Sequence, residues 1–170
     1  MARAFEILKE KYKIPHKLVL AGRPGYGYEK IRAEIASSQN KDEIIFPGFV
    51  KDEEKFSLIQ KSDVFLFPTF YEGFGIPVLE AQSAGVPVVT SNVSSLPEVA
   101  NGPVKSGADH GTSSAVLVDP NEPEFIAERT YALISDKELR NDIIKKGYEN
   151  VKRFSWEKCA KEIAEILNEK

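Results

Sequence analysis

Five short, largely apolar runs separated by segments of helical periodicity constrain this chain more than any other feature of its sequence. The runs cover residues 17–22, 43–48, 63–68, 86–91 and 114–120. Their apolar residues follow one another without alternation, which is typical of parallel strands buried on both faces. The order of the elements therefore predicts an α/β fold, a Rossmann-like doubly wound parallel sheet with helices on both faces.

Helical periodicity accounts for most of the remaining sequence. The expected helices are an opening one that contains residues 4–12 and six later ones, at 28–38, 52–62, 76–84, 122–135, about 136–152 and about 156–168. The last two are extra C-terminal helices. Ser155 is expected to cap the final helix, with Glu157 in its positive first turn. That helix carries one apolar stripe, formed by Trp156, Cys159, Ala160, Ile163 and Leu167.

The composition limits the classes of function open to the chain. Its 170 residues are 42% hydrophobic, which suits one domain with its own core. It has 23 basic and 26 acidic residues, so it lacks the basic excess of a general nucleic-acid binder. A single bound nucleotide stays compatible, because a helix N-terminus can hold a diphosphate.

Cysteine and histidine are too scarce for most metal sites. Cys159 is the only cysteine, which excludes an intrachain disulfide and a cysteine-based zinc site. His16 and His110 are the only histidines, and we interpret all three residues as incidental. The sequence has no apolar leader and no run near the roughly 18 residues of a membrane span. These features predict a cytoplasmic protein.

The loops after the strands are the places to look for a ligand site. In a parallel α/β sheet, ligands bind beyond the carboxyl ends of the strands, here at residues 22–27, 47–52, 68–76 and 90–97. The third loop contains a Gly-Phe-Gly turn, and the helix after it has proline in its first turn. A glycine turn exposes N–H groups, and together with a helix N-terminus it attracts an anion.

Two carboxylates flank this glycine turn. Glu72 precedes it, and Glu80 lies about one turn into the helix. A carboxylate accepts two hydrogen bonds side by side, which matches the vicinal hydroxyls of a sugar or a ribose. An anion seat beside two such carboxylates describes a nucleotide-sugar site that needs no metal ion. The spacing alone leaves an alternative open, in which Glu72 caps main-chain N–H groups and Glu80 is a solvated helix residue.

The central stretch FLFPTFYEGFGIPVLEAQSAGVPVVTSNVSSLPEVA carries a family resemblance. It resembles the C-terminal, donor-binding domain of family 4 retaining glycosyltransferases (glycosyl transferases group 1) of GT-B architecture, whose hallmark is two glutamates separated by seven residues. Four further segments follow in the family's order, so the resemblance covers nearly the whole chain: VLAGRPGYGYEKI, IIFPGFV, LVDPNEPEFIA and ELRNDIIKKGYENVKRFSWEKCA.

This resemblance implies a role for each candidate residue. The catalytic position falls on Glu72, beside the transferred sugar, and the ribose-binding position falls on Glu80. The remaining donor-binding positions fall on the turn and helix start, on the loop that cups the base, and on two strand ends: Gly73, Phe74, Gly75, Ile76, Phe49, Val50, Arg23 and Thr90. From their residue types alone, Phe49 and Val50 are equally compatible with core packing, Thr90 with a plain turn, and Arg23 with an exposed loop. Glu98 is interpreted as the start of a structural helix.

The implied reaction moves a sugar from a nucleotide diphosphate to an acceptor hydroxyl, with retention at the anomeric carbon and without a metal or other cofactor. Leaving-group stabilisation would be the main chemical contribution. The implied partners are a UDP-, GDP- or ADP-linked sugar and an N-terminal acceptor domain, through which any peripheral membrane contact would arise.

Two departures from the family pattern qualify these expectations. The family's domain begins with a strand, followed by basic residues that clamp the diphosphate, whereas this chain begins with a helix. We therefore expect residues 1–170 to be a donor-binding fragment that is inactive alone, with an unpaired sheet position that favours self-association. The polar segment 101–114 is longer than the family's usual connection, and its sequence assigns it no role.

Two other functions stay open at the level of sequence. A relative of sucrose or trehalose synthases would share the glutamate pair, and the acceptor that distinguishes it lies with the absent domain. A non-catalytic nucleotide-binding or interaction module of the same fold is the second alternative. Titration with UDP, GDP and ADP separates the interaction module from the donor-binding domain.

Overall fold

A computed structural model describes residues 1–25, 27–101 and 113–168. Its helices are α1 (Ala2–Tyr12), α2 (Tyr28–Ala36), the 3-10 helix η1 (Lys41–Glu43), α3 (Asp52–Gln60), α4 (Ile76–Ser83), α5 (Leu96–Asn101), α6 (Pro123–Ser135), α7 (Lys137–Val151) and α8 (Trp156–Asn168). Its strands are β1 (Leu18–Ala21), β2 (Ile44–Gly48), β3 (Phe65–Phe67), β4 (Val88–Ser91) and β5 (Val116–Val118). The predicted alternation of strands and helices is confirmed, with strands that are shorter than the apolar runs.

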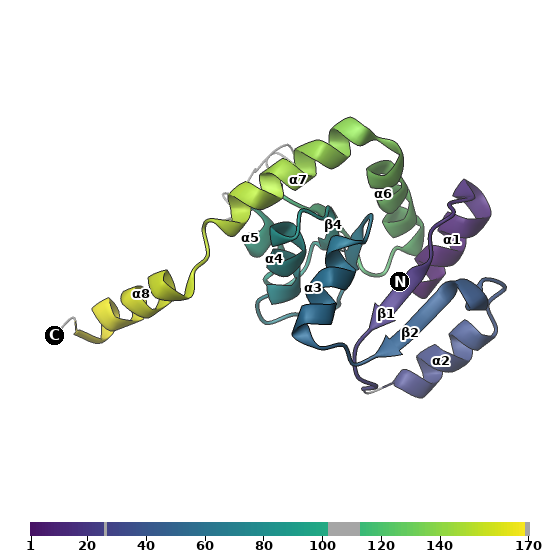
Figure 1. The fold of residues 1–170 in the computed structure, drawn as a ribbon, viewed down its shortest axis with the longest axis horizontal. Helices are drawn as coiled ribbons and strands as arrows, with labels where there is room; N and C mark the ends of the chain where they lie inside the picture. The colour runs from purple at the N-terminus through teal and green to yellow at the C-terminus, as the bar shows by residue number, and fades with distance from the viewer. Residues whose placement is uncertain (26, 102–112, 169–170) are drawn as a thin grey trace.

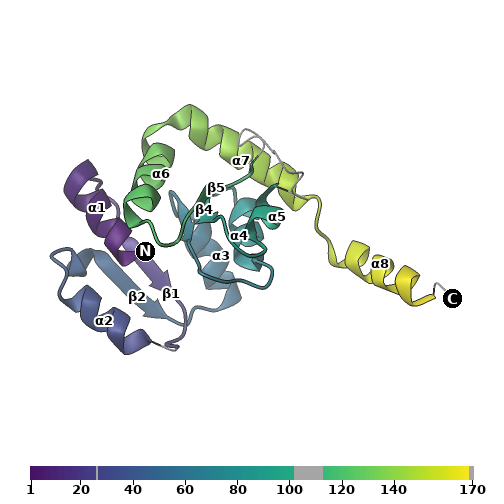
Figure 2. The same ribbon diagram turned by 180° about the vertical axis from the view of Figure 1, so that it is seen from behind.

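The strands β3, β4 and β5 form a parallel sheet with helices on both faces. Val89 of β4 belongs to a core cluster with residues of α1 and α6, whereas Val88 belongs to a second cluster with residues of α3, α4 and α5. Figures 1 and 2 show α6 and α1 side by side on one face, with α3 and α4 on the other. This arrangement confirms the doubly wound α/β fold.

The strands β1 and β2 form a separate two-stranded parallel sheet. Leu18 and Ile44 point into the cluster that contains α1, and Ile35 of α2 joins them there. The opposite face is poorly covered, since Val19 is 37% exposed and Ile45 is 42% exposed. The expectation of a single sheet with every strand buried on both faces is therefore wrong for this half.

The split has a simple physical cause. Among the described residues, no strand lies between β1 and β3, and these two strands are not hydrogen-bonded to each other. Each therefore keeps one edge without a ladder partner. The continuous core cluster against α1 and α6, which contains residues of both sheets, holds the two halves together instead.

The final helix α8 extends away from the rest of the molecule, as Figures 1 and 2 both show. Ser155 caps it as predicted, accepting a hydrogen bond from the Lys158 N–H at 3.0 Å. The predicted apolar stripe exists on the helix but every residue of it is exposed, and Trp156 is 79% exposed. No helix in the described ranges is both long and apolar enough to cross a bilayer.

Candidate functional site

The glycine turn between β3 and α4 has the conformation that its sequence predicts. Gly75 is the residue before α4 and has a φ of 105°, a left-handed conformation that favours glycine. Pro77 lies in the first turn of the helix. Within this fully described loop, no hydrogen bond is donated by the N–H groups of Gly73, Phe74 or Gly75. The turn therefore offers main-chain donors at a helix N-terminus, which is the arrangement that binds anions.

Two serines that follow β4 hold this turn in place. The Ser94 hydroxyl accepts a hydrogen bond from the Glu72 N–H at 3.1 Å. The Ser95 hydroxyl donates to the carbonyls of Glu72 at 2.9 Å and Phe74 at 3.0 Å. Ser94 thus binds the N–H of Glu72, and Ser95 binds carbonyls of the turn, so neither serine uses the N–H groups of Gly73, Phe74 or Gly75. Neither serine was among the predicted site residues, although a Ser-Ser pair directly before a helix is a recognisable capping signal.

The two predicted carboxylates lie on either side of this turn. Glu72 and Glu80 are both half-buried. The Lys55 ammonium of α3 donates to Glu80 Oε1 at 2.6 Å and lies 3.4 Å from Asp52 Oδ1. The pKa of Lys55 is raised above its ordinary value of 10.5, chiefly by the hydrogen bond to Glu80. Glu80 is therefore an oriented, ion-paired carboxylate rather than a freely solvated helix residue.

The loops after β1 and β2 meet beside each other. The Gly22 N–H donates to the Gly48 carbonyl at 2.9 Å, and the Arg23 guanidinium carbon lies 4.4 Å from the centre of the Phe49 ring. The Phe49 side chain is 61% exposed, so it does not serve the core. Val50 is half-buried and leads into α3. Arg23 and Phe49 thus form an exposed cation–π pair, and both side chains are of types that can stack on a planar group.

The Thr90 side chain is fully buried. Its hydroxyl donates to the Phe67 carbonyl of β3 at 3.0 Å, and the neighbouring Ser91 hydroxyl donates to the Thr69 carbonyl at 2.5 Å. Both side chains join the strands at the start of the glycine loop. A direct contact between Thr90 and a ligand stays a prediction. Phe74 and Ile76 remain exposed beside the turn, and the Phe74 ring packs edge-on against Phe154 at 5.7 Å.

The remaining titratable candidates lie elsewhere. His16 faces Asp63, with 3.3 Å between Nε2 and Oδ2, and Cys159 is exposed on α8. His110 and most of segment 101–114 fall outside the described residues. In the described ranges there is no group of three or more histidine, cysteine or carboxylate side chains that could hold a metal ion.

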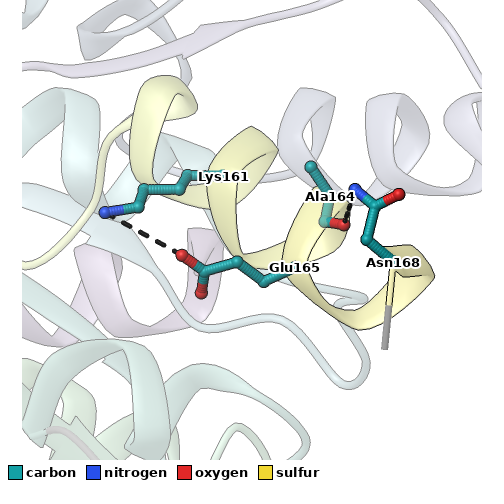
Figure 3. Close-up of a pocket in the computed structure, with 4 residues that line it drawn as sticks. All are labelled: Lys161, Ala164, Glu165 and Asn168. Atoms are coloured by element: carbon teal, nitrogen blue, oxygen red, sulfur yellow. Dashed lines mark hydrogen bonds and ion pairs between the residues drawn. The ribbon is translucent and has the colours of Figure 1, made fainter. Parts of the chain in front are cut away.

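A shallow depression on α8 is unrelated to this site. Figure 3 shows its four lining residues along one helix, with Lys161 directed toward Glu165 at 3.8 Å and the Asn168 amide donating to the Ala164 carbonyl at 2.8 Å. Because all four residues come from a single exposed helix, the depression lacks the enclosing walls of a ligand pocket.

Comparison with known proteins shows the family of the chain. Residues 1–150 match the family described as glycosyl transferases group 1. The chain belongs to this family. It is 32% identical over 159 residues to an O-antigen chain mannosyltransferase B of Escherichia coli, an alignment that covers 94% of this chain and 39% of that protein. The chain thus spans about two fifths of the length of this relative.

Two solved structures share the fold. The C-terminal domain of a group 1 glycosyl transferase, LpcC from Francisella tularensis, superposes with a TM-score of 0.71 and 25% identity, covering 89% of this chain and 75% of that one. Anabaena Alr3699/HepE, solved in complex with UDP and glucose, superposes with a TM-score of 0.79 and 20% identity over 99% of this chain and 44% of that one. The resemblance to the C-terminal domain of a GT-B glycosyltransferase is therefore confirmed.

Proposed function

We propose that this chain is the donor-binding domain of a retaining glycosyltransferase that uses a nucleotide-diphosphate sugar without a bound metal ion. The observation that carries the proposal is the turn at Gly75. It presents unpaired N–H groups at the start of α4, between the carboxylates of Glu72 and Glu80. The fold neighbour Alr3699/HepE, which was solved with UDP and glucose, supports the choice of ligand class.

The proposed chemistry assigns one task to each part of the site. The turn N–H groups and the positive end of α4 receive the diphosphate, on which negative charge develops as it leaves. Glu80 accepts hydrogen bonds from the ribose hydroxyls, and Glu72 accepts them from the sugar near its reacting carbon. The bond from the anomeric carbon to the diphosphate oxygen breaks, the acceptor oxygen bonds to that carbon on the same face, and the acceptor proton passes to the departing diphosphate.

The base and the acceptor complete the proposed complex. Arg23, Phe49 and Val50 surround the base, with the Arg23–Phe49 pair as a stacking surface. An N-terminal acceptor domain supplies the second substrate, so the isolated chain binds the donor without transferring the sugar.

Calorimetric titration with UDP, GDP and ADP tests the proposal. We expect one of them to bind to the wild-type chain and to bind at least about tenfold more weakly to Glu80→Gln, which loses a charged acceptor. Lys161→Met on the remote helix α8 is the control and should leave the affinity unchanged. A folded chain that binds none of the three nucleotides would support the alternative of a non-catalytic interaction module.

A further inference from the structure

Lys55 links the two ends of the proposed site. It lies on α3, the helix that follows the base-side loop, and its ammonium reaches across to Glu80 on α4 at 2.6 Å. Its contact with Asp52 is longer, at 3.4 Å, and the Asp52 side chain is 98% exposed. The Lys55 and Glu80 side chains are 35% and 30% exposed, respectively, so the contact between them is the shorter and the better shielded from solvent.

The start of α3 fixes where the main chain of Lys55 lies. The Lys51 N–H, which directly follows the base-side loop, donates to Glu54 Oε2 at 3.2 Å. One turn later the Lys55 N–H donates to the Lys51 carbonyl at 2.7 Å. The position of Lys55 therefore depends on the conformation of the loop that contains Phe49 and Val50. The contact with Glu80 couples this loop to the carboxylate on α4.

The chemistry of the pair matches a ribose better than a carboxylate alone would. Lys55 contacts only Oε1 of Glu80, and an ammonium has three N–H donors. A hydroxyl group both donates and accepts, so one ribose hydroxyl can donate to the carboxylate and accept from the ammonium. Holding the carboxylate in one orientation also lowers the entropy lost when the ligand binds.

We propose that Lys55 and Glu80 recognise the ribose as a pair: Lys55 fixes the Glu80 carboxylate and donates a hydrogen bond to the hydroxyl that Glu80 binds. The inference rests on the proposed function, since it requires a ribonucleotide at this site. It adds a positively charged residue of α3 to the part of the site that binds the ribose, which the proposed function assigns to Glu80 alone.

The test compares UDP, GDP and ADP with their 2′-deoxy counterparts by calorimetry, for the wild-type chain and its variants. For the nucleotide that binds most tightly, we expect the wild type to prefer the ribose form by about tenfold, as loss of a charge-assisted hydrogen bond predicts. Lys55→Met should reduce this preference to about threefold or less. Lys55→Arg, which keeps the charge and the donors, should retain more of the preference than Lys55→Met.

Lys61→Met is the matched control, because Lys61 is an exposed lysine directly after the same helix. It should keep the tenfold preference, and melting temperatures should show that all variants fold. An unchanged preference in Lys55→Met would overturn the role of Lys55 and leave the proposed function standing. A wild-type chain that binds no nucleotide would overturn both proposals, whereas equal binding of ribose and deoxyribose forms would remove the sugar-reading role from Glu80 and Lys55 together.

Discussion

The two sheets of this molecule are built from similar apolar runs but differ in how they are packed. All four residues of β4 are buried, and their sheet has helices on both faces. In the two-stranded sheet, Val19 and Ile45 remain more than a third exposed on a face that the described helices do not cover. The diphosphate and ribose positions of the proposed site lie on the half with the more deeply buried sheet, and the base position lies on the half with the more exposed sheet. This difference in packing predicts that the anion-binding turn before α4 is fixed and that the Arg23–Phe49 surface, proposed to bind the base, can adapt its shape.

The largest expected effect compares one core residue from each half. Leu96 on α5 is fully buried against α4 and β4, so Leu96→Ala should lower the free energy of unfolding by about 3 kcal/mol through lost burial and a cavity. Ile45→Ala on the exposed face of β2 should cost less than about 1 kcal/mol. Urea denaturation measures both variants. Equal losses would show that the two halves are packed alike.

A second pair of substitutions compares two glycines of left-handed conformation. Gly75 has a φ of 105°, and a Cβ there would lie 2.7 Å from Leu96 Cδ2, whereas Gly48 has a φ of 74° and open space around it. Gly75→Ala should cost about 2 kcal/mol of stability, and Gly48→Ala about 1 kcal/mol, because only the first adds an overlap to the backbone strain. Thermal melting measures the difference. A larger loss of stability for Gly48→Ala than for Gly75→Ala would contradict the conclusion that the surroundings of Gly75 are the more tightly packed.

Much of this contrast lies beyond what the sequence could predict. The apolar runs predicted the correct order of strands and helices, because this order follows from local periodicity. The glycines and Pro77 predicted the turn before α4, because that turn follows from local main-chain preferences. The missing pairing between β1 and β3 agrees with the unpaired sheet position that the family resemblance led us to expect, whereas local periodicity alone reports no pairing between distant strands. For the same reason the sequence could not show that Lys55 contacts Glu80, 25 positions away.

The final helix is a second example of a contact that a local sequence pattern cannot predict. Its apolar stripe was predicted correctly, but a stripe shows only that a helix has an apolar face, not which surface covers it.

A buried polar network also could not be predicted from the sequence. The Gln82 amide donates to the Ser114 hydroxyl at 2.9 Å, and the Asn150 amide donates to Gln82 Oε1 at 2.8 Å. These contacts join three segments that are far apart along the chain.

A third prediction concerns the edges of the loosely covered half. Since β1 has an edge without a ladder partner and an apolar face, we expect the chain to self-associate weakly at high concentration. Val19→Lys places like charges on both copies and should weaken this association about tenfold. Sedimentation velocity over a range of concentrations measures it. A wild-type chain that stays monomeric throughout would show that the edge is protected.

The smallest expected effect is a pH dependence of the contact between α3 and α4. Asp52 and Glu80 face Lys55, and the hydrogen bond to Glu80 raises the pKa of Lys55 above 10.5. The stabilisation that this ion pair contributes is therefore fully present below pH 10.5 and is lost as the pH rises through the folded-state pKa. The effect should be small, because the pair is partly exposed to solvent.

Melting temperatures between pH 8 and pH 12 test this prediction. The difference between the wild type and Lys55→Met should be constant up to about pH 10.5 and shrink above it. The difference in melting temperature between the wild type and Lys61→Met is measured as well, because it shows how the loss of an exposed lysine charge alone changes stability over this pH range. If the difference in melting temperature instead grows with pH, the charge of Lys55 destabilises the folded protein.

The contacts of Ser94 and Ser95 have a kinetic consequence. Ser95 is joined to the start of α5, where its carbonyl accepts from the Val99 N–H at 3.0 Å, and its hydroxyl holds two carbonyls of the glycine turn. The turn and α5 must therefore move together or not at all. A diphosphate that binds as proposed would meet a turn whose conformation these contacts hold before it arrives, so differences in affinity between ligands would arise mainly from how slowly each one leaves.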